Sequence, residues 1–311
     1  FYAPYLSKHL PGQPNVIVRN VPGGGSITGT NEFVARAEPD GLSLLGTSGS
    51  TQFPFLLGDS RVQYDYADLQ PVLVSPTGGV VYVPASLGIS DASELGQLMG
   101  TELVYASQGA TSLDLVPLLA FEVLGLDVRH VFGMTGRGDG RLAFERGEAT
   151  IDYQTSSAYL TNVVPLVESG DAVPLFSWGV LDGEGNVQRD PTFPDLPHFL
   201  EAYEMVNGEM GAAGIELQAY LAFFGSGFAA QKPAMLPNGT PPEIVEAYRQ
   251  AFVDAVADPE LQAAKVEILG EYDQAVGDEV AGVYTAATSI DPVARDWVRQ
   301  FLSENYQVTL E

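Results

Sequence analysis

The sequence contains no cysteine and very little positive charge. Without cysteine, the chain forms no disulfides, thiolate zinc sites or iron–sulfur clusters, and it offers no thiol nucleophile. Only Lys8, Lys232 and Lys265 are lysines, and 14 lysines and arginines face 40 acidic residues, so the formal net charge is -26. Nucleic acids and anionic membrane surfaces both require cationic partners. The composition therefore argues against both as binding partners.

Long apolar runs are also lacking, because no stretch approaches the ~18 apolar residues of a membrane span. A chain of 311 residues with 45% hydrophobic content nevertheless buries a substantial core, and its length predicts one large domain or two of ordinary size. We expect two lobes. The strong acidity keeps a protein soluble by self-repulsion that salt screens, which is compatible with a saline habitat.

Strand-like apolar runs alternate with helical patterns along most of the chain. The expected strands lie at 15–20, 42–48, 70–75, 79–85, 102–109, 128–133, 149–154, 172–179 and 223–231, and the expected helices at 26–37, 91–99, 138–146 and 156–169. This alternation is typical of βαβ units. We therefore predict an α/β fold with mixed, mostly parallel sheets and flanking helices.

The last 70 residues carry a helical pattern. Apolar residues recur at helical spacing from Ile244 to Val256, Thr240 is expected to cap this helix, and Pro241 and Pro242 suit its first turn. Before this part, residues 182–214 are rich in glycine, proline and acid, which predicts an irregular excursion with one helix near 196–206.

Motifs for catalysis and for metal or nucleotide binding are incomplete. The three histidines are far apart, and "GTSGS" at 46–50 ends in Ser50 where a nucleophile elbow requires glycine. The acidic stretch from residue 182 has Val187 and Phe193 where a calcium loop requires glycine and glutamate. No lysine follows a glycine-rich loop in the Walker pattern. We therefore predict no catalytic residue, no metal and no cofactor.

Five loops each follow a predicted strand and open a predicted helix. They are "PGGGS" (22–26), "GTSGST" (46–51), "YASQGATS" (105–112), "FGMTGRGDG" (132–140) and "DYQTSS" (152–157). Such loops converge at the carboxyl edge of a parallel sheet, where free N–H groups, helix dipoles and hydroxyls hold a small anion. In the alternative reading, Ser and Thr only cap the helices and Gly only permits the turns.

Within these loops, Arg137 has two possible roles: a bidentate partner for a ligand carboxylate, or a surface arginine among many acids. The three glycines at 23–25 are expected chiefly to form a turn that lets the helix from Ser26 pack close to the sheet. Direct ligand contact by Gly25 and Ser26 ranks as secondary.

The combined motifs resemble the extracytoplasmic solute receptors of tripartite tricarboxylate transporters, the TctC or Bug family. The resemblance is carried by "NVPGGG" (20–25), "ARAEPDG" (35–41), "GTSGS" (46–50), "YASQGATS" (105–112), "RGEATIDYQ" (146–154) and the segment 236–261 beginning "LPNGTPPEIV". Each motif is weak alone, but together they cover nearly the whole chain. The segment 182–214 looks longer than is usual in the family. The family pattern also includes an earlier strand and a "P-x-x-P-G-G" loop that the sequence does not show, so part of the pocket would lie there.

This resemblance implies a two-lobed type II periplasmic binding protein fold that closes on its ligand. Lobe 1 would comprise residues 1–83 and 225–311, and lobe 2 residues 84–224, with the cleft between them. The implied ligand-binding residues are Thr47, Ser48, Gly49, Ser107, Gly109, Ala110, Thr111, Ser112, Gly136, Arg137, Gln154, Thr155 and Ser156.

The implied function is capture of a small mono-, di- or tricarboxylate in the periplasm and its delivery to membrane transporter subunits by a monomeric receptor without enzymatic activity. The N-terminal residues lack the charged-then-apolar order of a signal peptide. Two alternatives remain: an α/β enzyme that uses Asp152 or Asp114 with a metal, and a ligand sensor of the same fold. A deeply buried carboxylate pair with a shifted pKa in the cleft would favour the enzyme.

Overall fold

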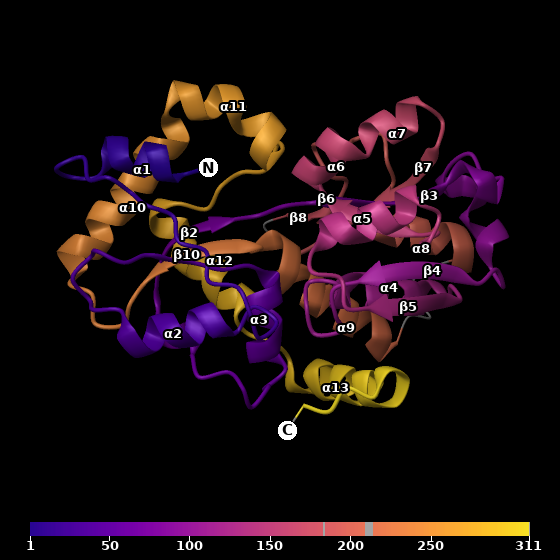
Figure 1. The fold of residues 1–311 in the computed structure, drawn as a ribbon, viewed down its shortest axis with the longest axis horizontal. Helices are drawn as coiled ribbons and strands as arrows, with labels where there is room; N and C mark the ends of the chain where they lie inside the picture. The colour runs from indigo at the N-terminus through magenta and orange to yellow at the C-terminus, as the bar shows by residue number, and fades with distance from the viewer. Residues whose placement is uncertain (183, 209–213, 311) are drawn as a thin grey trace.

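The chain folds into two lobes that lie side by side (Figure 1). The structure, a computed structural model, describes residues 1–182, 184–208 and 214–310. The predicted excursion at 182–214 therefore falls partly outside the described residues. No helix in the described ranges combines the length and the apolar character needed to cross a membrane.

The first lobe is built on an antiparallel sheet in the order β1 (Leu45–Gly46), β10 (Lys232–Leu236) and β2 (Gln70–Ser75). Its helices are α1 (Ala3–His9), α2 (Thr28–Arg36), α3 (Gly49–Leu56), α10 (Pro242–Ala257), α11 (Pro259–Leu269) and α12 (Val280–Ala287). The helices α10 and α12 contact β2, so the sheet is covered by C-terminal helices.

The second lobe contains an antiparallel sheet in the order β6 (Asp152–Thr155), β3 (Gly79–Pro84) and β7 (Ala172–Ser177). A parallel pair, β4 (Leu103–Ser107) and β5 (Val128–Phe132), and a short hairpin, β8 (Val180–Leu181) and β9 (Val187–Gln188), accompany it. Its helices are α4 (Leu115–Leu124), α5 (Arg137–Glu145), α6 (Ser156–Asn162), α7 (Val164–Glu168), α8 (Phe199–Asn207) and α9 (Ile215–Phe224), with a 3₁₀ helix at Ala92–Leu98.

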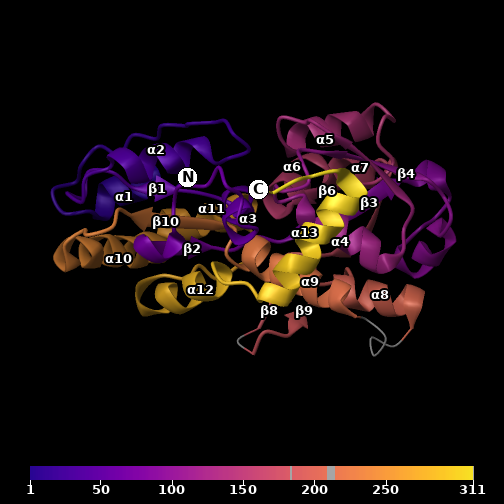
Figure 2. The same cartoon turned by 90° about the horizontal axis from the view of Figure 1, so that it is seen from below.

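The two lobes exchange chain at positions that differ from the predicted boundaries. Because β3 is the central strand of the second-lobe sheet, the first crossover lies at residues 76–78 rather than after residue 83. The return passes through a π-helical turn at Gly225–Ala229 into β10. The last helix, α13 (Pro292–Tyr306), was expected in lobe 1 but packs on α9 of the second lobe (Figure 2).

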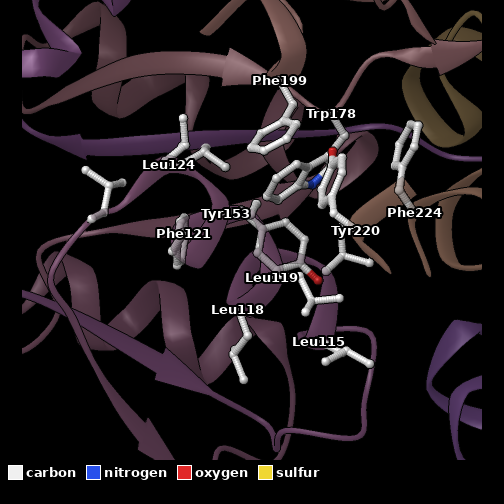
Figure 3. Packing of buried hydrophobic residues seen from close by; sticks show 14 of the residues in the cluster. Leu115, Leu118, Leu119, Phe121, Leu124, Tyr153, Trp178, Phe199, Tyr220 and Phe224 are labelled. Carbon is white, nitrogen blue, oxygen red and sulfur yellow. The ribbon is translucent and has the colours of Figure 1, made fainter. Parts of the chain in front are cut away.

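The largest apolar core surrounds α4, whose sequence "LVPLLAFEVL" is apolar on nearly every face. A helix that is apolar all round must be buried. Aromatic rings from several elements close over α4, among them Tyr153, Trp178, Phe199 and Tyr220 (Figure 3). Phe53 of the first-lobe helix α3 belongs to the same cluster, so this core also joins the first lobe to the second.

Most helix predictions are confirmed, whereas some strand predictions are wrong. Residues 15–20 form no strand; they run exposed, with Ile17 80% and Val18 70% accessible, and no described strand pairs with them. The predicted strand at 223–231 is the end of α9 and the π-helical turn, because a short buried apolar run has no periodicity that separates strand from helix. Thr240 does not cap α10; the N-cap is Pro241, and the Thr240 hydroxyl donates to the Pro237 carbonyl at 2.7 Å.

The mixed α/β class is confirmed, but the sheets are not mostly parallel. Among the described strands, β4 and β5 form the parallel ladder, and the other named pairs are antiparallel. The physical reason is the crossing of the chain between lobes. A strand such as β10 or β3 enters its sheet from the opposite lobe and runs against its neighbours.

Replacing Phe223 by alanine tests the shared core. Its ring is fully buried and lies edge-to-face with Phe53 at a centroid distance of 5.0 Å. We expect Phe223→Ala to lower the free energy of unfolding by roughly 3–5 kcal/mol, measured by urea denaturation. The matched control is Phe132→Ala, because Phe132 is 39% exposed. Equal losses in the two variants would contradict the assigned core.

Candidate functional site

The first-lobe loops open on a cavity of about 700 Å³. Thr47 and Ser48, both predicted ligand residues, line it together with Ser26. Of the two secondary candidates, Ser26 is therefore placed at the cavity, and Gly25 is not among its lining residues. The volume lies in the range of small-ligand sites.

The amino terminus of α3 begins at this cavity. Ser48 is its N-cap residue, but the Ser48 side chain makes no capping hydrogen bond. The first N–H groups of a helix have no partner within the helix and carry the positive end of its dipole. At this loop, therefore, the serine side chain does not cap the helix, and its hydroxyl lies beside the helix terminus. Thr47 is less free, because its hydroxyl lies 3.3 Å from the Tyr66 hydroxyl.

Two arginines that the sequence reasoning missed also line the cavity. Arg19 and Arg36 both donate to Glu32 Oε1, at 3.1 and 3.4 Å. Their side chains are 75% and 77% exposed, so both remain accessible to an anion. The sequence feature that could have identified these two arginines is the rarity of positive charge in so acidic a chain.

The glycine-rich loop at 22–26 forms the expected turn. Gly23, Gly24, Gly25 and Ser26 all have positive φ, between 61° and 127°. The loop also approaches α2 closely, because an added Cβ would lie 2.7 Å from Thr28 Oγ1 at Gly24 and 2.8 Å from the Val21 carbonyl oxygen at Gly29. Helix α2 starts at Thr28, two residues later than predicted.

In the second lobe, the loop at 107–112 is held by Asp114. Ser107 is fully buried and its hydroxyl donates to Asp114 Oδ2 at 3.0 Å, and the Gln108 N–H donates to the same oxygen at 2.7 Å. The Ser112 hydroxyl donates to the Gly109 carbonyl at 2.7 Å. Both serine hydroxyls are thus used within the protein, although neither of them caps α4, whose N-cap is Asp114.

The predicted loops of the two lobes meet at α3. The Leu113 N–H donates to the Ser50 hydroxyl at 3.1 Å, directly after the predicted residues Ala110, Thr111 and Ser112. Gly49 is buried there, and a Cβ on it would lie 2.7 Å from Leu113 Cδ1. Gly49 therefore serves close packing between lobes, while Gly109 and Gly136 have open space beside them.

Arg137 is the centre of a buried ionic network. Its Nη1 donates to the Ala106 carbonyl at 2.8 Å and to Asp114 Oδ2 at 3.1 Å, and its Nη2 pairs with Asp152. The guanidinium carbon lies 5.0 Å from the Tyr105 ring centroid and 4.7 Å from that of Tyr153. Only 11% of the side chain is exposed. In this arrangement the single positive charge of Arg137 is shared by two carboxylates of the protein itself.

The two aspartates of this network are the ones that the enzyme alternative required. Asp114 and Asp152 are fully buried, and burial raises the pKa of the Asp152 carboxyl against the opposing charge of Arg137. Tyr82 donates to Asp152 at 2.5 Å and Tyr153 to Asp114 at 3.2 Å. Neither carboxylate lines a described cavity. A buried carboxylate pair is thus present, but it faces protein groups.

The turn at 154–156 is held on both sides. Gln154 is buried and donates to the Arg137 carbonyl at 2.9 Å and to Asp152 Oδ2 at 3.0 Å. Thr155 is the N-cap of α6, without a side-chain capping bond. The Ser156 hydroxyl contacts the Tyr272 hydroxyl, which in turn donates to Asp190 Oδ2 at 2.7 Å. Sequence reasoning missed Tyr272 and Asp190, because nothing in the chain links them to residue 156.

The polar groups that line the first-lobe cavity are mainly hydrogen-bond donors. Over the described part of the chain, no group of three or more His, Asp and Glu residues is placed to hold a metal ion. The cavity offers hydroxyls, a helix terminus and guanidinium groups, which are donors for an anion.

Two lobes joined by crossover segments, with ligand-type loops at their boundary, define a two-lobed solute-binding protein. The sequence matches the family described as "Tripartite tricarboxylate transporter family receptor" over residues 3–276. The chain belongs to this family, which confirms the resemblance seen in the motifs. It is a family of receptors, not of enzymes. No curated protein matches the sequence.

Solved structures of the same fold cover nearly the whole chain. The periplasmic binding protein BugD is 19% identical, with 96% of this chain and 91% of that chain covered and a TM-score of 0.62. MatC from Rhodopseudomonas palustris with bound malate is 20% identical, with 95% and 91% covered and a TM-score of 0.62. The R. palustris protein Rpa4515 with adipate is 18% identical, with 96% and 89% covered and a TM-score of 0.63. These likenesses confirm the two-lobed periplasmic binding protein fold.

Replacing Arg137 by methionine tests the buried network. Two buried carboxylates would lose their cation, so we expect Arg137→Met to lower the free energy of unfolding by roughly 3–5 kcal/mol at pH 7. An aspartate whose folded-state pKa is raised favours folding below its ordinary value of 3.8 and loses that contribution as the pH rises through the folded-state pKa. Arg137 favours the charged form of Asp152 and so opposes this rise, which means that its removal raises the Asp152 pKa further and protonation then relieves the buried charge. The loss should therefore shrink on acidification from pH 7 towards pH 5, measured by urea denaturation.

The matched control is Arg146→Met, because Arg146 pairs with Glu148 on the surface, where the side chains are 56% and 59% exposed. We expect that change to alter stability by less than about 1 kcal/mol at either pH. A pH-independent loss in Arg137→Met would contradict the electrostatic role given to Arg137.

Proposed function

We propose that this chain is an extracytoplasmic receptor that captures a small organic carboxylate between its lobes and delivers it to the membrane subunits of a tripartite tricarboxylate-type transporter. It acts in the periplasm as a monomer and catalyses no reaction. The observation that carries the proposal is the amino terminus of α3, which opens with Thr47 and Ser48 on the 700 Å³ cavity without side-chain capping.

Electrostatics supports a site of this kind. A chain with a net charge of -26 repels an anion at long range. A carboxylate therefore needs local positive potential, which the helix dipole of α3 supplies. Arg19 and Arg36 add two positive charges at the cavity against the one negative charge of Glu32, to which both donate. All the residues that line the cavity lie between 17 and 51, in the first lobe. The second-lobe loop that follows β4 contacts α3 beside it, where the Leu113 N–H donates to the Ser50 hydroxyl at 3.1 Å.

The comparisons support the choice of ligand class. The chain belongs to a receptor family for tricarboxylate-type transporters, and two structures of the same fold hold the dicarboxylates malate and adipate. The residues proposed to contact the ligand are Thr47, Ser48 and Ser26 from the first lobe, and Gly109, Thr111, Gly136 and Thr155 from the second. Arg137, Ser107 and Gln154 position these loops from behind.

A thermal-shift panel of mono-, di- and tricarboxylates tests the proposal. A ligand that binds only the folded protein stabilises it by about 2.7 kcal/mol at 100 times Kd, so the melting temperature should rise by a few degrees for at least one member. Ser48→Tyr should abolish that rise by filling the cavity at the end of α3.

The control is Ser303→Tyr, because Ser303 is exposed on α13, away from the cavity. It should retain the full ligand response. Absence of a shift with every carboxylate in the unsubstituted protein would overturn the proposed function, and an unchanged response in Ser48→Tyr would overturn the assigned site.

A further inference from the structure

The hydroxyl of Ser156 belongs to a buried chain of three polar side chains. Ser156 contacts the Tyr272 hydroxyl, and Tyr272 donates to Asp190 Oδ2 at 2.7 Å. Ser156 and Asp190 are fully buried, and Tyr272 is 3% exposed. Burial raises the pKa of the Tyr272 phenol, so it stays protonated and donates. The second oxygen of Asp190 accepts from the Thr192 N–H at 2.8 Å, which leaves the carboxylate well satisfied.

This chain of side chains crosses from one lobe to the other. Ser156 begins α6, and Asp190 follows β9, so both belong to the second lobe. Tyr272 belongs to the first lobe, because the nearby Ala275 bridges Val74 of β2. A second bond follows the same path, from the Glu271 N–H to the Thr192 hydroxyl at 3.0 Å. Helices α11 and α6 are in contact here, at the top of Figure 1.

The network also lies against the crossover between the lobes. Gly78 connects β2 to β3, and its carbonyl accepts the Ser156 N–H at 3.2 Å. A Cβ on Gly78 would collide with Asp190 and with the Tyr272 hydroxyl, and would lie 2.9 Å from the Ser156 hydroxyl. The crossover is thus packed directly on the three side chains. Rotation of one lobe against the other about this crossover must move Tyr272 relative to Ser156 and Asp190.

We propose that Tyr272 is an inter-lobe latch, held by Asp190, that positions Ser156 and the start of α6 against the first lobe. The inference rests on the proposed function, in which the lobes move apart and together around a ligand. In this proposal the segment after β9 takes part in the contact between the lobes, because it supplies Asp190 and Thr192 to the latch.

The latch is reversible for a physical reason. A bond from a neutral phenol to a carboxylate is stronger than a bond between neutral groups. When the lobes separate, water replaces the phenol at Asp190, so neither state leaves a buried charge without a donor. The latch therefore adds stability to the arrangement described here without preventing the lobes from opening. In this proposal the Ser156 hydroxyl bonds to Tyr272 and fixes the start of α6, and it does not contact the ligand directly.

The experiment measures the distance between the lobes in the absence of any carboxylate. Because the chain has no cysteine, Ala263→Cys on α11 and Glu168→Cys on α7 place one spin label on each lobe at exposed positions. Pulsed electron–electron double resonance then gives the distribution of distances between the two spin labels. In Tyr272→Phe we expect a longer and broader distribution, with the population of the arrangement described here reduced about tenfold relative to open forms.

The matched control is Tyr284→Phe. Tyr284 is also a buried tyrosine, and its hydroxyl donates to the Tyr66 carbonyl at 2.8 Å, but both residues lie in the first lobe. It should lose thermal stability without any change in the inter-lobe distance. Ser156→Ala removes a single bond of the latch and should give a smaller change in the same direction as Tyr272→Phe.

Unchanged distances in both Tyr272→Phe and Ser156→Ala would overturn the latch, and so would an equal change in Tyr284→Phe. Because no ligand is added, these outcomes are independent of the carboxylate panel. A failed panel with a widened Tyr272→Phe distribution would overturn the proposed ligand and keep the latch.

Discussion

The ion pairs of Arg137 hold the second lobe's half of the site together. One guanidinium bonds Asp114, Asp152 and the Ala106 carbonyl, and it lies between the rings of two tyrosines. Asp114 in turn fixes the loop at 107–112, and Gln154 donates to the Arg137 carbonyl. Three loops that are distant in sequence therefore share one buried charge. A buried charge that loses its partners is strongly destabilising, so the loops cannot move independently.

The protein must attract an anion although it carries a net charge of -26. In the structure, the long-range repulsion and the local attraction act over different distances. The surface acids act at long range and are screened by salt, whereas in the proposed site the start of α3 acts locally through its N–H groups and dipole. Arg19 and Arg36 line the same cavity and share Glu32 as a partner. Arg137 of the second lobe pairs with two carboxylates of the protein, Asp114 and Asp152, rather than with the proposed ligand.

Close approach at glycine recurs wherever the lobes meet. Gly49 lies against Leu113, Gly227 against Phe53, and Gly78 against Tyr272 and Asp190. At each position a side chain would push one lobe away from the other. The large core around α4 reinforces this contact, since Phe53 of the first-lobe helix α3 packs into it. The lobes are thus joined by apolar packing on one side and by the Tyr272 hydrogen bonds near the crossover.

The sequence by itself determined the α/β class, the family, the loops that follow the strands, and most helices, because these depend on local periodicity and on motifs of a few residues. It placed Thr47 and Ser48 in a ligand loop, and the structure places both residues at a cavity. Tertiary structure alone decided what each polar group bonds. Arg137 and Asp114 are 23 residues apart, and Ser156 and Tyr272 are 116 apart, so no local pattern announces either contact. Strand direction was likewise decided by the fold, since β3 and β10 enter their sheets from the opposite lobe. The sequence of a single strand does not determine which neighbours it pairs with.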